Sequence, residues 1–194
     1  YRDWKRWGHG RVNLRDAVVQ SCDTYFYDMG FKLGIERLHR YMTQFSLGQP
    51  TGIDLHNESS GIMPSKQWKK AARGRPWFHG DTINASIGQG FVLATPLQLA
   101  NATAIMANHG KQVVPTLAGD TKPVERTDIV LNDQSNWEKM ADAMVGVTQL
   151  GGTARAMAVK AKYDIAAKSG TAQVFSVGQD ETYNEEELTE RLLD

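Results

Sequence analysis

The stretch Lys168-Ser169-Gly170-Thr171 decides the fold of this chain, and it lies within the segment YDIAAKSGTAQVF at residues 163–175. Alternating small and apolar residues around it predict a β-strand. A glycine inside a strand often marks a close approach by a ligand or another backbone. A lysine beside two hydroxyls supplies the charge and the directed donors that bind a carboxylate. The alternative is an edge strand with a surface lysine, since a four-residue motif has low specificity by itself.

The predicted strand at 163–175 has no adequate partner elsewhere in the sequence. Residues 112–117 predict one short strand, and the remainder is predicted to form helices and loops. Because a strand must pair its backbone N–H and C=O groups, we expect the rest of its sheet to lie outside this chain. The start at Tyr1 without Met and the helix-like pattern at the other end are also typical of an excised piece.

Composition and charge limit the class of protein. The chain has 194 residues, enough for one domain or most of one, and it balances 22 basic against 22 acidic residues. This balance gives no electrostatic basis for nucleic-acid binding. No apolar run reaches membrane-spanning length, no signal peptide is present, and the single Cys22 excludes an internal disulfide. The basic run at 66–75 and the acidic tail from Asp180 are expected to be solvated faces, and Trp4 is expected to pack.

Helical periodicity and capping residues predict most of the regular structure. We expect one helix after the N-cap Asn13, a second that follows the break at residues 21–23 and ends at Gly34, and a third at 35–45. Further helices are expected to start at Ser65, to run from Thr95 to Asn108 and from Ser135 to about Thr148, to follow Thr153 and to start at Asn184. Ser135 and Glu138 form the Ser-x-x-Glu pattern of a capping box at one of these starts. Apart from the helix at Ser65, residues 48–81 are expected to be loop, because turn residues recur through them.

Ser21 and Asp23 lie at the break between the first two expected helices. A hydroxyl and a carboxylate two residues apart at a helix junction can point into one cleft, where they can relay a proton and hydrogen-bond a substrate amide. The alternative is helix capping, since serine and aspartate are both preferred N-caps. In isolation the two residues favour capping.

Taken together and in this order, the Ser-x-Asp and Lys-Ser-Gly motifs resemble two signatures of the penicillin-recognising serine transpeptidases, Ser-x-Asn and Lys-Thr/Ser-Gly. Asp23 departs from the family's Asn. Within that family the whole chain, residues 1–194, is similar to the elongation-type class B enzymes, the subgroup of penicillin-binding protein 2 of Gram-negative rods. The similarity is carried by YRDWKRWGHG at 1–10, SCDTYFY at 21–27, TGIDL at 51–55, GDTI at 80–83, IGQG at 87–90, ATPLQ at 94–98 and AKSGTAQV at 167–174.

The resemblance implies an α+β fold like that of penicillin-binding proteins and serine β-lactamases, in which an antiparallel sheet is joined to a helical subdomain. The chain, residues 1–194, would then be a partial transpeptidase domain with the helical part and the strand that carries Lys168. The implied activity is peptidoglycan D,D-transpeptidation during cell elongation. A serine would attack a D-Ala-D-Ala stem peptide, form an acyl-enzyme and pass the acyl group to an amine of another strand. β-Lactams would mimic the dipeptide and trap the acyl-enzyme.

The resemblance also implies a role for each motif residue. Lys168 would keep the cleft positive and attract the substrate carboxylate, Ser21 would relay a proton toward the leaving amine, and Asp23 would position the general base and the substrate amide. The extra carboxylate of Asp23 would raise the proton affinity of a nearby lysine. The hydroxyls of Ser169 and Thr171 would bind the carboxylate, and the N–H of Thr171 would form half of an oxyanion hole. The implied substrate-binding residues are Ser169, Gly170, Thr171 and Gln173.

The family's nucleophile, the serine of a Ser-x-x-Lys motif, is absent, because no serine of the sequence has a lysine three residues later. In the family this motif precedes Ser-x-Asn, so we expect it upstream of Tyr1 and expect the chain alone to be inactive. The implied location is the periplasmic face of the inner membrane, anchored through an upstream segment, in an elongation complex with a membrane glycosyltransferase and a scaffold protein. Two alternatives stay open: a non-catalytic sensor or scaffold with the same penicillin-recognising fold, and a metal-braced interaction module built on residues 1–45.

Asp3, His9 and Cys22 form a second constellation, because carboxylate, imidazole and thiolate are all zinc ligands. A fourth ligand could come from upstream sequence. Since Cys22 adjoins Ser21, a structural zinc ion here would brace the loop that presents the Ser-x-Asp motif, although no cofactor is required for the implied catalysis. The alternative is a buried structural thiol and a core histidine, because the spacing matches no standard zinc motif.

Overall fold

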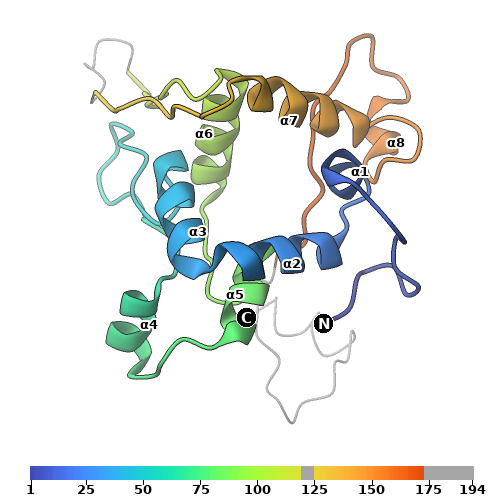
Figure 1. Cartoon of the computed structure of the whole chain (residues 1–194). Helices are drawn as coiled ribbons and strands as arrows, with labels where there is room; N and C mark the ends of the chain where they lie inside the picture. The colour runs from blue at the N-terminus through green and yellow to red at the C-terminus, as the bar shows by residue number, and fades with distance from the viewer. Residues whose placement is uncertain (119–124, 173–194) are drawn as a thin grey trace, which may run out of the picture.

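The computed structural model of the chain describes residues 1–118 and 125–172, and this part is mostly helical (Figure 1). The expected helix from Asn184 lies outside the described residues. The helices, in chain order, are α1 (Leu14–Val19), α2 (Asp23–Leu33), α3 (Ile35–Met42), the short 3₁₀-helix η1 (Thr43–Phe45), α4 (Lys66–Arg73), α5 (His79–Ser86), α6 (Pro96–Ala107), α7 (Ser135–Gly146) and α8 (Arg155–Ala158).

Three predicted N-caps are confirmed. The side chains of Asn13, Ser65 and Thr95 each accept a hydrogen bond from the backbone N–H three residues later, at the starts of α1, α4 and α6. Gln98 completes a capping box on α6, since its side chain accepts from the Thr95 N–H. Such caps satisfy backbone donors that have no partner within the helix, so a short sequence pattern is enough to place them.

Two predictions about helix starts are wrong. The helix α7 begins at Ser135 after the N-cap Gln134, which makes no side-chain cap bond, and the Asp133 carboxylate accepts from both the N–H and the hydroxyl of Ser135. Glu138 instead pairs with His109, at 3.2 Å between their side-chain atoms. The helix α5 falls partly within the region expected to be loop. It begins where the Asp81 carboxylate accepts from the backbone N–H of Phe78, a cap that the turn-rich sequence around it concealed.

The predicted strands are not formed within the described residues. Residues 112–117 and 163–172 carry no ladder, and Ile62 and Leu93 form only an isolated antiparallel bridge. A strand exists only against a neighbouring strand that takes up its N–H and C=O groups, and the described residues place none beside either segment. Residues 173–175 of the predicted strand lie outside the described residues.

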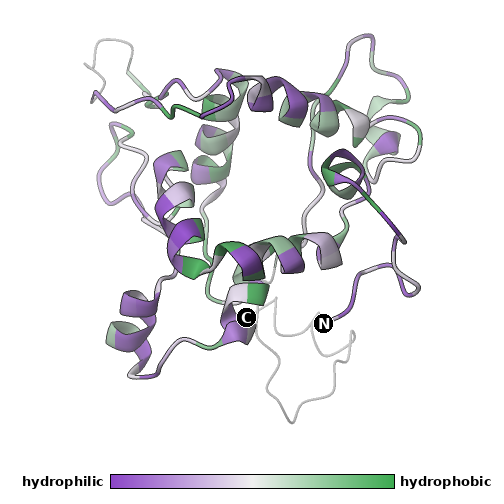
Figure 2. Cartoon of the chain, in the orientation of Figure 1, coloured by the Kyte–Doolittle hydropathy of each residue, from purple (hydrophilic) through white to green (hydrophobic). Residues whose placement is uncertain are grey.

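Buried apolar side chains form three small clusters, which match the alternation of hydrophobic and hydrophilic positions along the helices in Figure 2. The first joins η1, α6 and α7. The second joins the end of α1 to the end of α7, and the third holds α5 against the start of α3 and the segment before α4. Their buried members are Phe45, Ile105, Ile129 and Trp137; Val18, Ala143 and Val147; and Ile35, Met63 and Ala85.

The basic run at 66–75 is not uniformly solvated, which corrects the expectation for Lys69. This lysine is 4% exposed, and its Nζ lies 2.5 Å from a carboxylate oxygen of Asp81. Its ammonium also lies over the rings of Trp77, Phe78 and Phe91. A buried charge is stable only when it is paired, so Lys69 ties α4 to the start of α5. Within the described ranges, none of the helices combines the length and apolarity needed to cross a bilayer.

Candidate functional site

Ser21 occupies an unusual backbone position at the end of α1. Its φ is 52°, in the left-handed region that favours glycine. The N–H of Ser21 donates to the Val18 carbonyl at 3.2 Å, and the N–H of Cys22 donates to the Ala17 carbonyl at 2.9 Å. These two bonds form a Schellman helix ending, whose left-handed residue is usually glycine. A serine in this conformation has a strained backbone, and residues with such strain are concentrated at functional sites.

Trp4 holds the same junction from outside the helices. Its indole Nε1–H lies 3.2 Å from the carbonyl of Gln20 and 2.9 Å from the carbonyl of Ser21. Its backbone N–H donates to the Asp23 carboxylate at 3.1 Å. Trp4 is 61% exposed, and its ring packs against that of His9, with 5.4 Å between the ring centroids. The N-cap of α2 is Cys22 without a side-chain cap bond, so neither Ser21 nor Asp23 serves as a helix cap.

The segment that carries Lys168 is held by the end of α7. The N–H of Ala167 donates to the Met144 carbonyl at 3.0 Å, and the Thr148 hydroxyl lies 2.7 Å from the Ile165 carbonyl. Thr148 is 4% exposed, so these contacts are shielded from water. Since α7 packs on α1 through the cluster of Val18, Ala143 and Val147, the same helix end positions both motifs.

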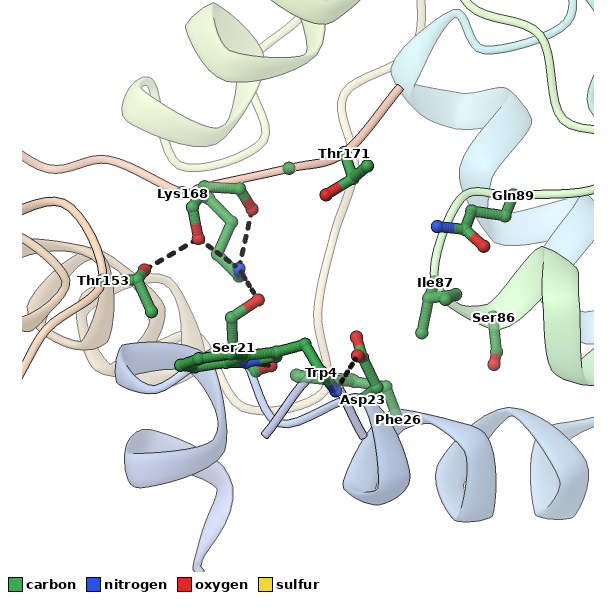
Figure 3. Close-up of a pocket in the computed structure, with 12 residues that line it drawn as sticks. Trp4, Ser21, Asp23, Phe26, Ser86, Ile87, Gln89, Thr153, Lys168 and Thr171 are labelled. Carbon is green, nitrogen blue, oxygen red and sulfur yellow. Dashed lines mark hydrogen bonds between the residues drawn. The ribbon is translucent and has the colours of Figure 1, made fainter. Parts of the chain in front are cut away.

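The two motifs meet at the Lys168 ammonium, although they are 147 positions apart in the sequence (Figure 3). Lys168 Nζ lies 2.7 Å from the Ser21 hydroxyl and 2.9 Å from the Ser169 carbonyl. It also lies 3.4 Å from the Ser169 hydroxyl. Among the described residues no carboxylate lies within ion-pairing distance of this ammonium, which therefore has charge to offer a ligand.

The charge of Lys168 depends on two opposing effects. Desolvation of the ammonium lowers the pKa of Lys168 from its ordinary value of 10.5, and the Asp23 carboxylate raises it in part. The predicted effect of Asp23 therefore has the right sign but is the smaller of the two. A lysine with a lowered pKa gives up its proton more readily than an ordinary lysine.

Both motifs line one cavity of about 750 Å³. Lys168 and Thr153 lie on one side of it, and Ser86, Ile87 and Gln89 lie opposite, at the end of α5 (Figure 3). The helices α2 and α5 approach each other closely at this wall, since a Cβ on Gly30 would collide with the side chain of Ser86. Glycine inside a helix costs about 1 kcal/mol relative to alanine, and here it permits a close approach.

The structure brings together six of the seven predicted motif residues at the cavity. Ser21, Asp23, Lys168, Ser169, Gly170 and Thr171 all line it, while Gln173 lies outside the described residues. Sequence reasoning did not assign the six other lining residues to the site: Trp4, Phe26, Ser86, Ile87, Gln89 and Thr153. The signal that could have found Ile87 and Gln89 is the turn Gly88-Gln89-Gly90. The signal for Thr153 was the Gly-Gly pair before it, which permits a tight return of the chain.

Asp3, His9 and Cys22 also come together, behind the Ser21 junction. One ligand atom from each lies within 4.8 Å of the other two. His9 Nδ1 lies 3.1 Å from a carboxylate oxygen of Asp3, and both side chains are 2% exposed. Cys22 is likewise 2% exposed. A thiolate, an imidazole and a carboxylate gathered in a shielded site form a donor set that suits zinc.

The model of the penicillin binding protein transpeptidase domain matches residues 1–190. The chain belongs to this family. The resemblance found in the motifs is thereby confirmed, as is the transpeptidase fold. The chain is 47% identical to the peptidoglycan D,D-transpeptidase MrdA of Acinetobacter baumannii over 203 residues, which cover 100% of this chain and 30% of that protein.

Solved structures of relatives have the same fold. Pseudomonas aeruginosa PBP2 in complex with WCK 5153 matches with a TM-score of 0.85 and 45% identity, covering 90% of this chain and 41% of the other. Helicobacter pylori PBP2 in complex with MreC matches with a TM-score of 0.84 and 37% identity, covering 90% of this chain and 33% of the other. The chain spans just under a third of the length of the curated MrdA relatives.

Proposed function

We propose that the full-length protein carrying this chain is a peptidoglycan D,D-transpeptidase, and that residues 1–194 are part of its transpeptidase domain. The observation that carries the proposal is the Lys168 ammonium, which contacts the Ser21 and Ser169 hydroxyls but no carboxylate among the described residues. A stem peptide ending in D-Ala-D-Ala offers the missing anion through its terminal carboxylate. The MrdA name of the curated relatives supports the same activity.

Each motif residue then has a step to perform. Lys168 attracts the carboxylate of the substrate, and the hydroxyls of Ser169 and Thr171 donate hydrogen bonds to it. Ser21 relays a proton toward the leaving amine. Its hydroxyl contacts the Lys168 ammonium, and the lowered pKa of Lys168 favours this proton transfer. Asp23 accepts from the substrate amide, and the backbone N–H of Thr171 stabilises the negative oxygen of the tetrahedral intermediate.

The nucleophile comes from another part of the full-length protein. None of the serines in this sequence begins a Ser-x-x-Lys motif. The cavity is lined from one side by Lys168 and from the other by the end of α5, so a serine presented between them would face both the ammonium and the relay hydroxyl. The chain alone would therefore bind ligand without being acylated.

The experiment that tests the proposal is intact-mass measurement of the full-length protein before and after incubation with a penicillin, followed by peptide mapping. We expect a single acyl adduct on a serine that is followed three residues later by a lysine. Release of D-alanine from a pentapeptide that ends in D-Ala-D-Ala separates the enzyme from the non-catalytic alternative. A protein that is acylated by penicillin but releases no D-alanine would be the non-catalytic sensor or scaffold. A folded protein that forms no adduct would contradict both the transpeptidase and the sensor or scaffold.

We also propose that the full-length protein is anchored in the bacterial inner membrane, faces the periplasm and acts with the other membrane proteins of cell elongation, a glycosyltransferase and a scaffold. Support comes from the relative of Helicobacter pylori, whose structure holds MreC. Fractionation of cells that express the full-length protein is the direct test. Recovery in the cytosolic fraction would contradict the location, and co-purification with the native MreC-type partner from cross-linked cells tests the assembly.

We further propose that Asp3, His9 and Cys22 hold a structural zinc ion, with a fourth ligand from elsewhere in the full-length protein or from water. The ion would supply folding energy and fix the Ser21 junction, and the catalytic steps do not pass through it. Metal analysis of the purified full-length protein should find about one zinc per chain. Cys22→Ser should lose it, whereas His56→Ala, a change at an exposed histidine outside the cluster, should keep it. Zinc-free wild-type protein would remove this proposal.

A further inference from the structure

Thr153 makes a side-chain contact that the motifs do not account for. Its Oγ1 lies 2.7 Å from the Oγ of Ser169, and both residues line the cavity (Figure 3). Ser169 is the hydroxyl to which the proposed function assigns the substrate carboxylate. Thr153 lies 16 positions earlier in the chain, on the loop between α7 and α8.

The loop that carries Thr153 is held by its own backbone. The N–H of Thr153 lies 3.4 Å from the Val19 carbonyl, and the N–H of Ala154 donates to the Val147 carbonyl at 2.9 Å. Gly152 passes so close to the Val147 carbonyl that a Cβ there would collide with it. These contacts fix the loop between α1 and α7 without using the Thr153 side chain. Within the described part of the chain, the hydroxyl of Thr153 hydrogen-bonds only to Ser169.

The hydrogen-bonding capacity of the Ser169 hydroxyl indicates which of the two hydroxyls donates in this contact. A serine hydroxyl has two lone pairs and one proton, whereas an ammonium can only donate. Lys168 Nζ, at 3.4 Å, is a donor to the Ser169 oxygen. If Thr153 donates to the same oxygen, both lone pairs of Ser169 are occupied. The one proton of Ser169 is then left for an acceptor in the cavity.

We propose that Thr153 is a positioning residue, whose hydroxyl donates to Ser169 and thereby turns the Ser169 proton toward the carboxylate of the ligand. The inference rests on the proposed function, since it concerns recognition of the same carboxylate. Thr153 acts through Ser169 and does not itself contact the reacting atoms. The ligand class it favours is a penicillin or peptide with a free carboxylate, as opposed to its ester.

The first test compares Thr153→Val with Thr153→Ser in the full-length protein. Valine keeps the shape of threonine and removes the hydroxyl, whereas serine keeps the hydroxyl. The measured quantity is the second-order rate constant of acylation by a penicillin and by its methyl ester. Loss of one hydrogen bond predicts that Thr153→Val slows acylation by the free acid about 3- to 10-fold, changes acylation by the ester less than about 2-fold, and leaves Thr153→Ser near wild type.

Thr103→Val is the matched control, because it removes an exposed threonine hydroxyl that lies 2.8 Å from the Leu99 carbonyl, outside the residues that line the cavity. It should change neither rate. A merely structural role for Thr153 would slow acylation by the acid and the ester equally, and that result would overturn the inference. An unchanged rate in Thr153→Val would overturn it as well.

The second test separates action through Ser169 from direct contact with the ligand. In a Ser169→Ala background, Thr153→Val should cause no further loss with the free acid, because its only target is gone. A full additional loss would mean that Thr153 binds the carboxylate directly, which contradicts the positioning role. Wild-type protein that forms no adduct at all would overturn the proposed function and this inference with it, whereas normal acylation of every variant overturns this inference alone.

Discussion

Lys69 and Lys168 are two lysines of one chain in opposite electrostatic situations. Lys69 is 4% exposed, and its ammonium contacts the Asp81 carboxylate and the faces of three aromatic rings. Lys168 is exposed at the cavity, and its ammonium contacts two hydroxyls and a carbonyl but no carboxylate among the described residues. The first charge is neutralised within the protein, whereas the second is left for an anion from outside.

This difference separates a lysine that stabilises the fold from one that serves a ligand. A buried cation without a partner would destabilise the protein, so Lys69 carries its own counter-ion. A ligand-binding cation with its own carboxylate would have to break that pair before binding, which costs affinity. Asp23 is close enough to raise the pKa of Lys168 but does not pair with it.

The largest effect is expected at the cavity. Lys168→Ala removes the charge that attracts the carboxylate, so acylation of the full-length protein by a penicillin should slow about 10²- to 10³-fold, as for the loss of one preorganised catalytic donor. The midpoint of unfolding should change little, because Lys168 is exposed and has no ion pair within the described chain. Rate constants from intact-mass time courses give the first quantity. Lys70→Ala, at an exposed lysine of α4, is the control that should leave both unchanged.

The opposite pattern is expected for Lys69. Lys69→Met leaves the Asp81 carboxylate without its cation, so the free energy of unfolding should fall by about 3 kcal/mol. Acylation at low temperature should stay within about 3-fold of wild type, since the lysine lies outside the cavity lining. Urea titration of the full-length protein measures the stability. The double change Lys69→Met with Asp81→Asn should recover part of the loss, and a Lys70→Met loss of the same size would contradict the buried pair.

The pH dependence of acylation should identify the charge of Lys168. The proton is needed on the lysine, and its pKa is lowered from 10.5, so the rate should fall as the pH rises through a value below 10.5. Asp23→Asn removes the negative charge that raises this pKa, so the falling limb should move to lower pH. Asp23→Glu keeps the negative charge, so the pH at which the acylation rate falls should stay near that of the wild type. An identical limb in both variants would show that Asp23 does not act on Lys168.

The smallest effects are expected at the N-caps of two helices, the one next to Ser21, which contacts Lys168, and the one that carries Lys69. Asn13→Ala removes the cap of α1, the helix that leads to Ser21, and Ser65→Ala removes the cap of α4, the helix that carries Lys69. Each should lower the free energy of unfolding by about 1 kcal/mol. Only Asn13→Ala should also slow acylation, by a few-fold at most. Equal acylation rates in the two variants would mean that the start of α1 does not position Ser21.

The sequence predicted features that depend on a few neighbouring residues. The caps at Asn13, Ser65 and Thr95 are hydrogen bonds that span three residues, so the pattern of side chains is sufficient to identify them. The same reasoning failed at Ser135, because the Asp133 carboxylate binds the N–H and the hydroxyl of Ser135 that a capping box would use. It did not identify the contacts that hold the described part of the predicted strand at 163–175, where the Ala167 N–H and the Ile165 carbonyl bond to Met144 and Thr148 at the end of α7.

By itself, the sequence determined the family, the capped helix starts at Asn13, Ser65 and Thr95 and the chemical groups of the site, because these depend on local order and residue type. Only the tertiary structure decided which groups meet. Lys168 reaches Ser21 across 147 positions, Thr153 reaches Ser169, and Lys69 is buried against Asp81 while Lys66 and Lys70 on the same helix are exposed. Such contacts depend on how α1, α5 and α7 pack, and packing is set by side chains distant in sequence that fill one volume together.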